Sequence, residues 1–283
     1  MTVFIMALVL GLFPARALAA PPDALSIVKQ MKEVFEPARP STRKISISLS
    51  AGNQKVQWVA AQGRKEFPDG KRMVTVLLAP ESLKGTAYLI AERRNQPTLM
   101  WVYLPSSLRV REILPADAYE HFLGSDFTYT DLGWVRLHES YTLLGEEEHD
   151  AVRAYKVEER VPKERAYYSR LVTWVAADSK VPLQRDYYDV AGVLWKRELF
   201  DEVSVIGGIP TPLRIRMEDL QAKTSTELDM SEVRYDVDIP ETAFDPGHLP
   251  DLVTLPLWEA YGSRAVAGSG PPASGRPKST QGP

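Results

Sequence analysis

Cysteine is absent from this chain of 283 residues. The protein therefore contains no disulfide, and no cysteine can carry a lipid anchor. Burial of apolar side chains must supply its stability, and a chain of this length can achieve that within one domain. The formal net charge is also small, at −3. Nucleic-acid binding requires clustered positive charge, so we expect no nucleic-acid partner.

Long apolar runs are equally scarce. The run "TVFIMALVLGLF" near the start is about a dozen residues long, whereas a membrane span needs ~20. Pro14 follows it, and Ala17 and Ala19 then form the A-x-A pattern that signal peptidase reads. We predict a signal peptide at residues 1–20 and a periplasmic location. Because no Lys or Arg precedes the run, a buried N-terminal helix is the alternative.

The other end of the chain is rich in Gly, Pro and Ser. Such a composition cannot bury enough apolar surface to fold, so we predict a disordered tail at residues 261–283. A single folded domain at residues 21–260 remains between the two ends. It should open with one amphipathic helix, because Asp23 is a candidate N-cap and Leu25, Val28 and Phe35 follow at helical spacing.

After this helix the hydrophobic period changes to two. Ile45, Ile47 and Leu49 alternate with serines, as in a half-buried strand. Roughly a dozen similar segments follow with short turns between them, so the strands should be antiparallel and in meander order. A sheet this large must curl. The pattern alone fits either a well-packed β-sandwich or a curled sheet around an apolar cavity, and it leaves open which strand face points inward.

Two candidate groups of residues follow from the curled-sheet interpretation. The opening helix would supply part of a lid over the cavity. Large apolar side chains on the strands would form its wall. The predicted lid residues are Met31, Val34 and Phe35, and the predicted wall residues are Trp58, Leu99, Trp101 and Trp174.

The most distinctive sequence lies in the middle of the chain. The segment "MWVYLPSSLRVREIL" (100–114) precedes "HFLGSDFTYTDL" (121–132), which we call the central motif. Together they resemble the outer-membrane lipoprotein-sorting family of LolA-like carriers. Late segments at residues 209–219 and 239–249 resemble that family too. The resemblance implies a mainly β fold, in which a single curled antiparallel sheet forms an unclosed β-barrel with covering helices.

The central motif is best interpreted as a structural plug. Gly124 allows a sharp turn, Asp126 can cap a short helix, and Phe127 and Tyr129 can fill one edge of the sheet. We expect Asp126 or Asp131 to pair with a nearby arginine, and the candidate arginines are Arg109 and Arg111. Direct contact with a ligand or partner is the alternative. A catalytic carboxylate pair is disfavoured, because no nucleophile or metal shell lies nearby.

Catalytic and metal-binding motifs are missing elsewhere too. The four histidines are scattered, and no H-E-x-x-H, G-x-S-x-G or phosphate-binding loop occurs. We therefore predict no enzyme activity, no metal and no cofactor. The resemblance implies a carrier of lipoprotein or lipid acyl chains, working between an inner-membrane transporter and an outer-membrane acceptor. The alternative function is a non-catalytic adaptor or sensor module of an envelope complex.

Overall fold

The computed structural model describes residues 22–132, 140–161, 167–258 and 261. The predicted signal peptide lies outside these residues, and so does the predicted tail except for Tyr261. Tyr261 is 1% exposed and packs in the apolar core, so the folded domain continues to at least this residue. No helix within the described ranges combines the length and the apolar character of a membrane span.

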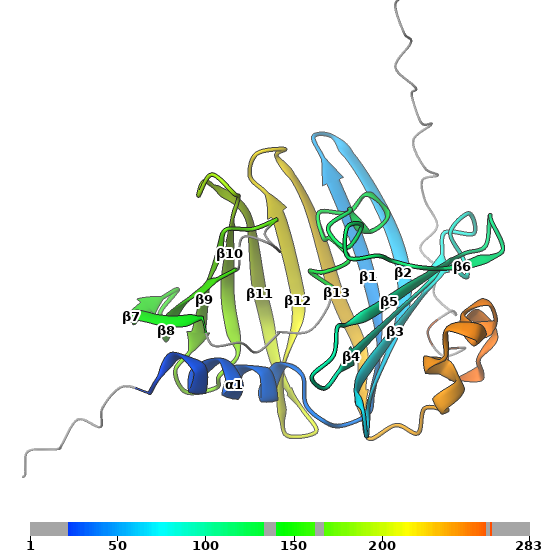
Figure 1. The fold of residues 1–283 in the computed structure, drawn as a ribbon, viewed down its shortest axis with the longest axis horizontal. Helices are drawn as coiled ribbons and strands as arrows, with labels where there is room; N and C mark the ends of the chain where they lie inside the picture. Colours follow the sequence, from blue (N-terminus) through cyan, green and yellow to red (C-terminus); the bar gives the residue numbers. More distant parts are fainter. Residues whose placement is uncertain (1–21, 133–139, 162–166, 259–260, 262–283) are drawn as a thin grey trace, which may run out of the picture.

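Within these described ranges, thirteen strands form one antiparallel sheet (Figure 1). The first six are β1 (Ser41–Ala51), β2 (Gln54–Phe67), β3 (Gly70–Ala79), β4 (Ala87–Arg93), β5 (Leu99–Leu104) and β6 (Arg109–Glu112). The other seven are β7 (Tyr141–His149), β8 (Val152–Arg160), β9 (Arg170–Ala176), β10 (Pro182–Tyr188), β11 (Leu194–Ile206), β12 (Ile209–Asp219) and β13 (Thr224–Tyr235). Apart from β6 and β7, neighbouring strands in the sequence also pair in space, as the short turns predicted.

The sheet is not closed into a barrel. Its strand order is β6-β5-β4-β3-β2-β1-β13-β12-β11-β10-β9-β8-β7, which leaves β6 and β7 as opposite edges. The pairing of β1 with β13 joins the two meanders, with Ile45 opposite Met230 and Ile47 opposite Leu228. These four side chains belong to one buried cluster on the concave face. The predicted mainly β, unclosed fold is confirmed.

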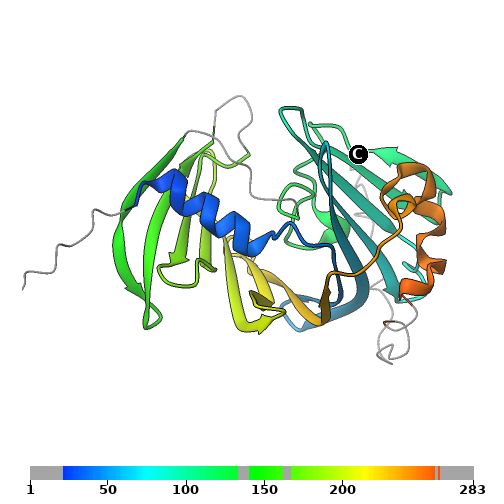
Figure 2. The ribbon, with the colours of Figure 1, turned by 90° about the horizontal axis from the view of Figure 1, so that it is seen from below.

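Helix α1 (Ala24–Phe35) begins at the predicted cap, because the side chain of Asp23 accepts a hydrogen bond from Ser26 N at 3.0 Å. Its buried face includes Ile27 and Met31 and packs against a cluster from β8 and β9 that contains Tyr155. Figure 2 shows α1 running from these strands toward the middle of the molecule. The helix therefore covers mainly the half of the sheet that contains β7 to β11, which we call the far wing. The half that contains β2 to β6 is the other wing.

Three short 3-10 helices near the C-terminus cover the convex face of the other wing (Figure 2). They are η3 (Glu241–Phe244), η4 (Pro246–Thr254) and η5 (Pro256–Trp258). Phe244, Leu249 and Trp258 are buried there against side chains of β2 to β5. This wing is consequently covered on both faces, which explains the long buried runs in β2, β3 and β4.

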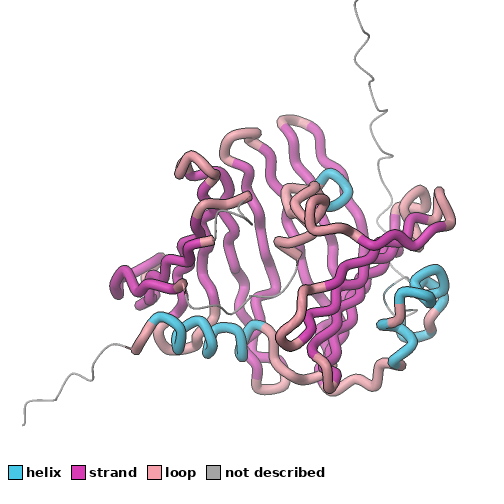
Figure 3. Tube along the Cα trace, viewed as in Figure 1, coloured by secondary structure: helices cyan, strands magenta, loops and turns pink. Residues whose placement is uncertain are grey.

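The chain after β6 must cross the open side of the sheet, because β6 and β7 are opposite edges. Residues 113–132, with the 3-10 turn η1 (Phe122–Gly124), lie over the concave face of β3 to β5 (Figure 3). Phe122 and Tyr129 pack there against Tyr88, Met100 and other inward side chains. The central motif is thus the element that fills the opening.

Candidate functional site

A cavity of about 230 Å³ lies between the concave face and the central motif. Its apolar lining from the sheet includes Ile45, Ile47, Ile215, Leu228 and Met230, and the covering elements add Phe35, Phe122, Phe127 and Leu132. Polar side chains also reach it, notably Arg64, Arg185 and Glu198. The volume is somewhat below the roughly 300–1,000 Å³ of drug-sized ligand sites, so a large ligand requires the covering elements to move.

Asp131 fixes the central motif to the far wing of the sheet. Its Oδ2 accepts a hydrogen bond from Thr128 N at 2.8 Å, and Asp131 N donates to Thr128 Oγ1 at 3.1 Å. Tyr168 Oη donates to the same carboxylate at 3.1 Å. Burial, and secondly the charge of Asp131, raise the pKa of Tyr168 well above its ordinary value. The phenol therefore stays protonated as a donor.

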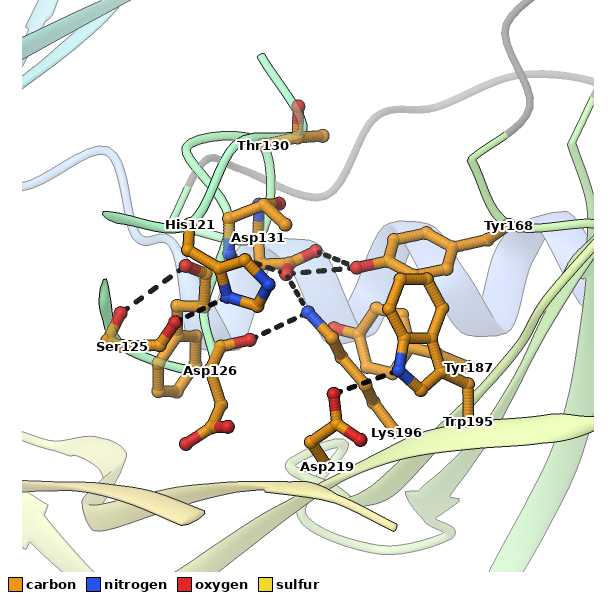
Figure 4. Close-up of polar contacts among 12 residues, drawn as sticks. His121, Ser125, Asp126, Thr130, Asp131, Tyr168, Tyr187, Trp195, Lys196 and Asp219 are labelled. Carbon is orange, nitrogen blue, oxygen red and sulfur yellow. Dashed lines mark hydrogen bonds and ion pairs between the residues drawn. The ribbon is translucent and has the colours of Figure 1, made fainter. Parts of the chain in front are cut away.

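Lys196 of β11 completes this anchor (Figure 4). Its side chain is 0% exposed, and its Nζ lies 3.7 Å from Asp131 Oδ2. Lys196 Nζ also donates a hydrogen bond to Asp126 O at 2.7 Å and lies 5.0 Å from the ring centroid of Trp195. The buried ammonium group of Lys196 therefore links Asp131 and Asp126 of the central motif to strand β11.

Asp126 connects the central motif to β13, in the middle of the sheet, through hydrogen bonds with two threonines. Its Oδ2 accepts a hydrogen bond from Thr226 Oγ1 at 2.7 Å, its Oδ1 accepts one from Thr224 Oγ1, and its backbone N–H donates to Thr226 Oγ1 at 2.9 Å. The expectation that Asp126 caps a short helix is wrong. The carboxylate turns to the threonine hydroxyls of β13, because the inward face of that strand lies directly under the motif.

The predicted pairing of the motif with Arg109 or Arg111 is also wrong. Both arginines lie on the exposed edge strand β6, and Arg111 Nη1 lies 3.4 Å from Asp117 Oδ2 instead. Nearness in sequence was misleading, because the chain turns away from β6 before it reaches the motif. Gly124 adopts φ +81°, Phe127 lines the cavity, and Tyr129 is buried against Tyr88 and Met100 of the sheet.

None of the four predicted wall residues lines the cavity. Trp101 packs on the convex face beside the C-terminal helices, and strand alternation puts Leu99 on the same face. Trp174 lies on the outer side of the far wing, where its Nε1 donates to Glu147 Oε1 at 2.6 Å. Trp58 is on the concave face and packs in the same cluster as Ile47, behind the cavity lining.

One of the three predicted lid residues reaches the cavity. Phe35 lines it, with its ring 5.5 Å from that of Phe200 in an edge-to-face arrangement. Met31 is buried instead against β8 and β9, and Val34 is half-buried. The C-terminal end of α1 is therefore the part that borders the cavity.

A second charged cluster lines the cavity beside the anchor. Glu198 Oε2 accepts a hydrogen bond from Tyr187 Oη at 2.7 Å and lies 3.3 Å from Arg185 Nη1. Burial raises the pKa of Glu198, with Arg185 acting in the opposite direction. The charges of Arg185 and Glu198 therefore compensate each other, and Tyr187 donates a further hydrogen bond to Glu198.

A family model described as "-like: Uncharacterized protein" matches residues 69–251, more than half of the chain. The chain belongs to this family. No protein with a curated description matches the sequence. Among solved structures, a DUF1329 family protein from Desulfovibrio piger has a TM-score of 0.75 and 29% identity, over 80% of this chain and 97% of that one.

Two further solved structures share the fold. An outer membrane lipoprotein-sorting protein domain from Vibrio parahaemolyticus has a TM-score of 0.75 at 24% identity, over 80% of this chain and 98% of that one. A LolA superfamily protein from Nitrosomonas europaea has a TM-score of 0.64 at 22% identity, over 80% and 98%. The resemblance stated from the sequence is confirmed, and the fold is LolA-like.

Several residues of this site were missed in the sequence. Neither Lys196 nor Glu198 was singled out from the sequence, but both side chains are buried. Strand alternation offered a signal, because Lys196 and Glu198 share the parity of Phe200, which is buried in the concave cluster. Thr224 and Thr226 gave no comparable signal, since their partner Asp126 lies about a hundred residues away in the chain.

Proposed function

We propose that this protein is a periplasmic carrier that holds an acyl chain of a lipoprotein or lipid in the concave cavity. In this role it receives its cargo at an inner-membrane transporter and delivers it to an outer-membrane acceptor. The observation that carries the proposal is the cavity itself. It is lined mainly by aliphatic and aromatic side chains from both wings of an unclosed sheet.

The physical basis is the transfer of methylene groups from water to this lining. Each buried CH₂ contributes ~0.8 kcal/mol, so part of one acyl chain binds without a strong polar contact. The likeness to a lipoprotein-sorting domain supports the same role at the level of fold. No cluster of three metal-ligating side chains occurs among the described residues, and Asp131, Lys196 and Glu198 beside the cavity are engaged in structural contacts.

Filling the cavity tests this function. Ile215 lines it and is 5% exposed, so Ile215→Trp should occupy space that an acyl chain would use. We expect the variant to bind a fluorescent fatty acid at least about tenfold more weakly than the wild type, a loss of ~1.4 kcal/mol. Val205→Trp is the matched control, because Val205 is 72% exposed on β11.

The two variants and the wild type would be compared by fluorescence titration after their folding is checked by circular dichroism. Equal binding by all three proteins would show that the acyl chain does not enter this cavity. Failure of the wild type to bind any fatty acid would instead favour the adaptor or sensor function.

A further inference from the structure

Two arginines lie side by side at one end of the cavity. Arg43 of β1 pairs in register with Gln62 of β2, and Arg64 follows two residues later on the same face. Such diagonal neighbours are about 7–8 Å apart. Arg64 and Gln62 line the cavity, together with Met230, whose Sδ lies 3.5 Å from Arg43 Nη1. Arg64 therefore borders the cavity directly, and Arg43 is connected to the lining through its contact with Met230.

Both guanidinium groups are short of hydrogen-bond acceptors. Arg43 is 5% exposed, and its contacts are the Met230 sulfur, Ser41 Oγ at 3.4 Å and the side chain of Tyr235. Arg64 Nε donates to Gln62 Oε1 at 3.1 Å. Among the described residues, no acceptor lies within reach of Arg43 Nε or Arg64 Nη1, although both atoms are buried. An arginine carries five donors, so this arrangement leaves buried donors of both groups without an acceptor.

Nearby carboxylates do not neutralise the pair. Glu36 attracts Arg64 electrostatically, but its Oε2 lies 3.1 Å from Lys32 Nζ within α1. Burial, and secondly the charge of Arg64, lower the pKa of Arg43 to about 9. Burying a charge without a partner is costly, and two adjacent like charges add to the cost. Such an arrangement calls for a compensating anion.

The apolar lining continues directly from the arginines along the strands. On β1, Arg43 is followed on the same face by Ile45 and Ile47, and the partner positions on β13 are Met230 and Leu228. A polar end thus leads into an apolar stripe. Gln62 Nε2 donates to Thr75 Oγ1 at 3.3 Å, which fixes the amide that orients the Arg64 guanidinium.

We infer that the cavity selects an anionic amphiphile, whose carboxylate or phosphate head binds Arg43 and Arg64 while its acyl chain lies along the apolar stripe. This inference rests on the proposed function and specifies the cargo class. Guanidinium groups match carboxylate and phosphate oxygens with paired N–H donors. A neutral head group leaves the same donors unsatisfied, so the charge distinguishes ligands of equal chain length.

Calorimetric titration of the wild type at neutral pH tests this directly. Dodecanoate, dodecyl phosphate and dodecanol would be compared below their micelle concentrations, with inorganic phosphate as the head group alone. We expect both anionic amphiphiles to bind about tenfold or more tightly than dodecanol, as charge-assisted hydrogen bonds imply. Inorganic phosphate should bind far more weakly than dodecyl phosphate. These comparisons require no variant, so misfolding cannot obscure them.

Arg64→Gln should abolish the preference for the anionic amphiphiles and leave dodecanol binding unchanged. Arg94→Gln is the matched control and should behave as the wild type, because the Arg94 side chain is 66% exposed and contacts Glu66 away from the cavity. Equal affinity of the wild type for dodecanoate and dodecanol would overturn the inference but leave the carrier function intact. Inorganic phosphate binding as tightly as dodecyl phosphate would overturn it as well. Binding of none of the amphiphiles would overturn the carrier function and this inference with it.

Discussion

At the scale of single residues, Lys196 has a role that its local sequence does not reveal. It lies between Trp195 and Arg197, and Arg197 Nε forms an ion pair with Asp186 at 2.8 Å. Alternation puts Lys196 on the opposite face, where Asp131 and the carbonyl of Asp126 receive its charge. The direction of the side chain was predictable from parity. Its partners were not, because they lie about seventy residues earlier in the chain.

Lys196→Met should destabilise the protein by about 3 kcal/mol, because it leaves the buried carboxylate of Asp131 without its cation. Lys55→Met is the control, since Lys55 is exposed on β2 and surface substitutions usually change stability by less than about 0.5 kcal/mol. Urea unfolding monitored by circular dichroism measures both. Adding Asp131→Asn to Lys196→Met should recover part of the loss. Equal stability of the two lysine variants would show that the anchor contributes nothing.

At the scale of elements, the central motif is both a plug and a cavity wall. The plug was predicted from "HFLGSDFTYTDL", which combines apolar side chains with a turn at Gly124. The prediction for α1 was less accurate. Its apolar stripe indicated a covering helix, but periodicity identifies which face is buried and not which strands receive it. Most of that face packs on β8 and β9, and the cavity is reached only by Phe35.

Gly124→Ala tests the motif as an element. Gly124 has φ +81°, and a Cβ there would meet no atom within 4 Å, so the substitution imposes backbone strain alone, about 1 kcal/mol. Gly192→Ala is closely matched, because Gly192 has φ +80° and equally open surroundings in the β10–β11 turn. Thermal unfolding should show similar losses for both variants.

Fatty-acid titration should separate these two glycine variants. Gly124 adjoins residues that line the cavity, including Phe122 and Ser125, so only Gly124→Ala should weaken acyl-chain binding. Equal binding by the two variants would show that the conformation of the motif does not shape the cavity.

At the scale of the whole molecule, the open sheet determines where a ligand can lie. Strand alternation and short turns predicted the meander, yet they left the inward register open. The choice of Trp101 and Leu99 as wall residues was wrong by one position, since the inward residues of β5 are Met100 and Val102. The missing information is tertiary. The C-terminal helices cover the convex face of β2 to β5, so both faces of this wing carry large apolar side chains.

The pairing of β1 with β13 was also beyond local patterns. It joins residues nearly two hundred positions apart, such as Ile45 and Met230, and it brings the arginines of β1 and β2 to the same concave face as the aliphatic stripe. The cavity forms because the pairing of β1 with β13 joins the two halves of the sheet, while the edge strands β6 and β7 stay unpaired with each other. An amphiphile bound there would complete the core that the sheet leaves unfilled.

Native mass spectrometry of the protein purified without detergent tests this account most directly. We predict a bound species with the mass of an acyl-chain amphiphile on the wild-type and Val205→Trp proteins, and its loss from Ile215→Trp. A wild-type protein with no bound mass, even after incubation with a total lipid extract, would contradict the central claim that a foreign acyl chain occupies the cavity.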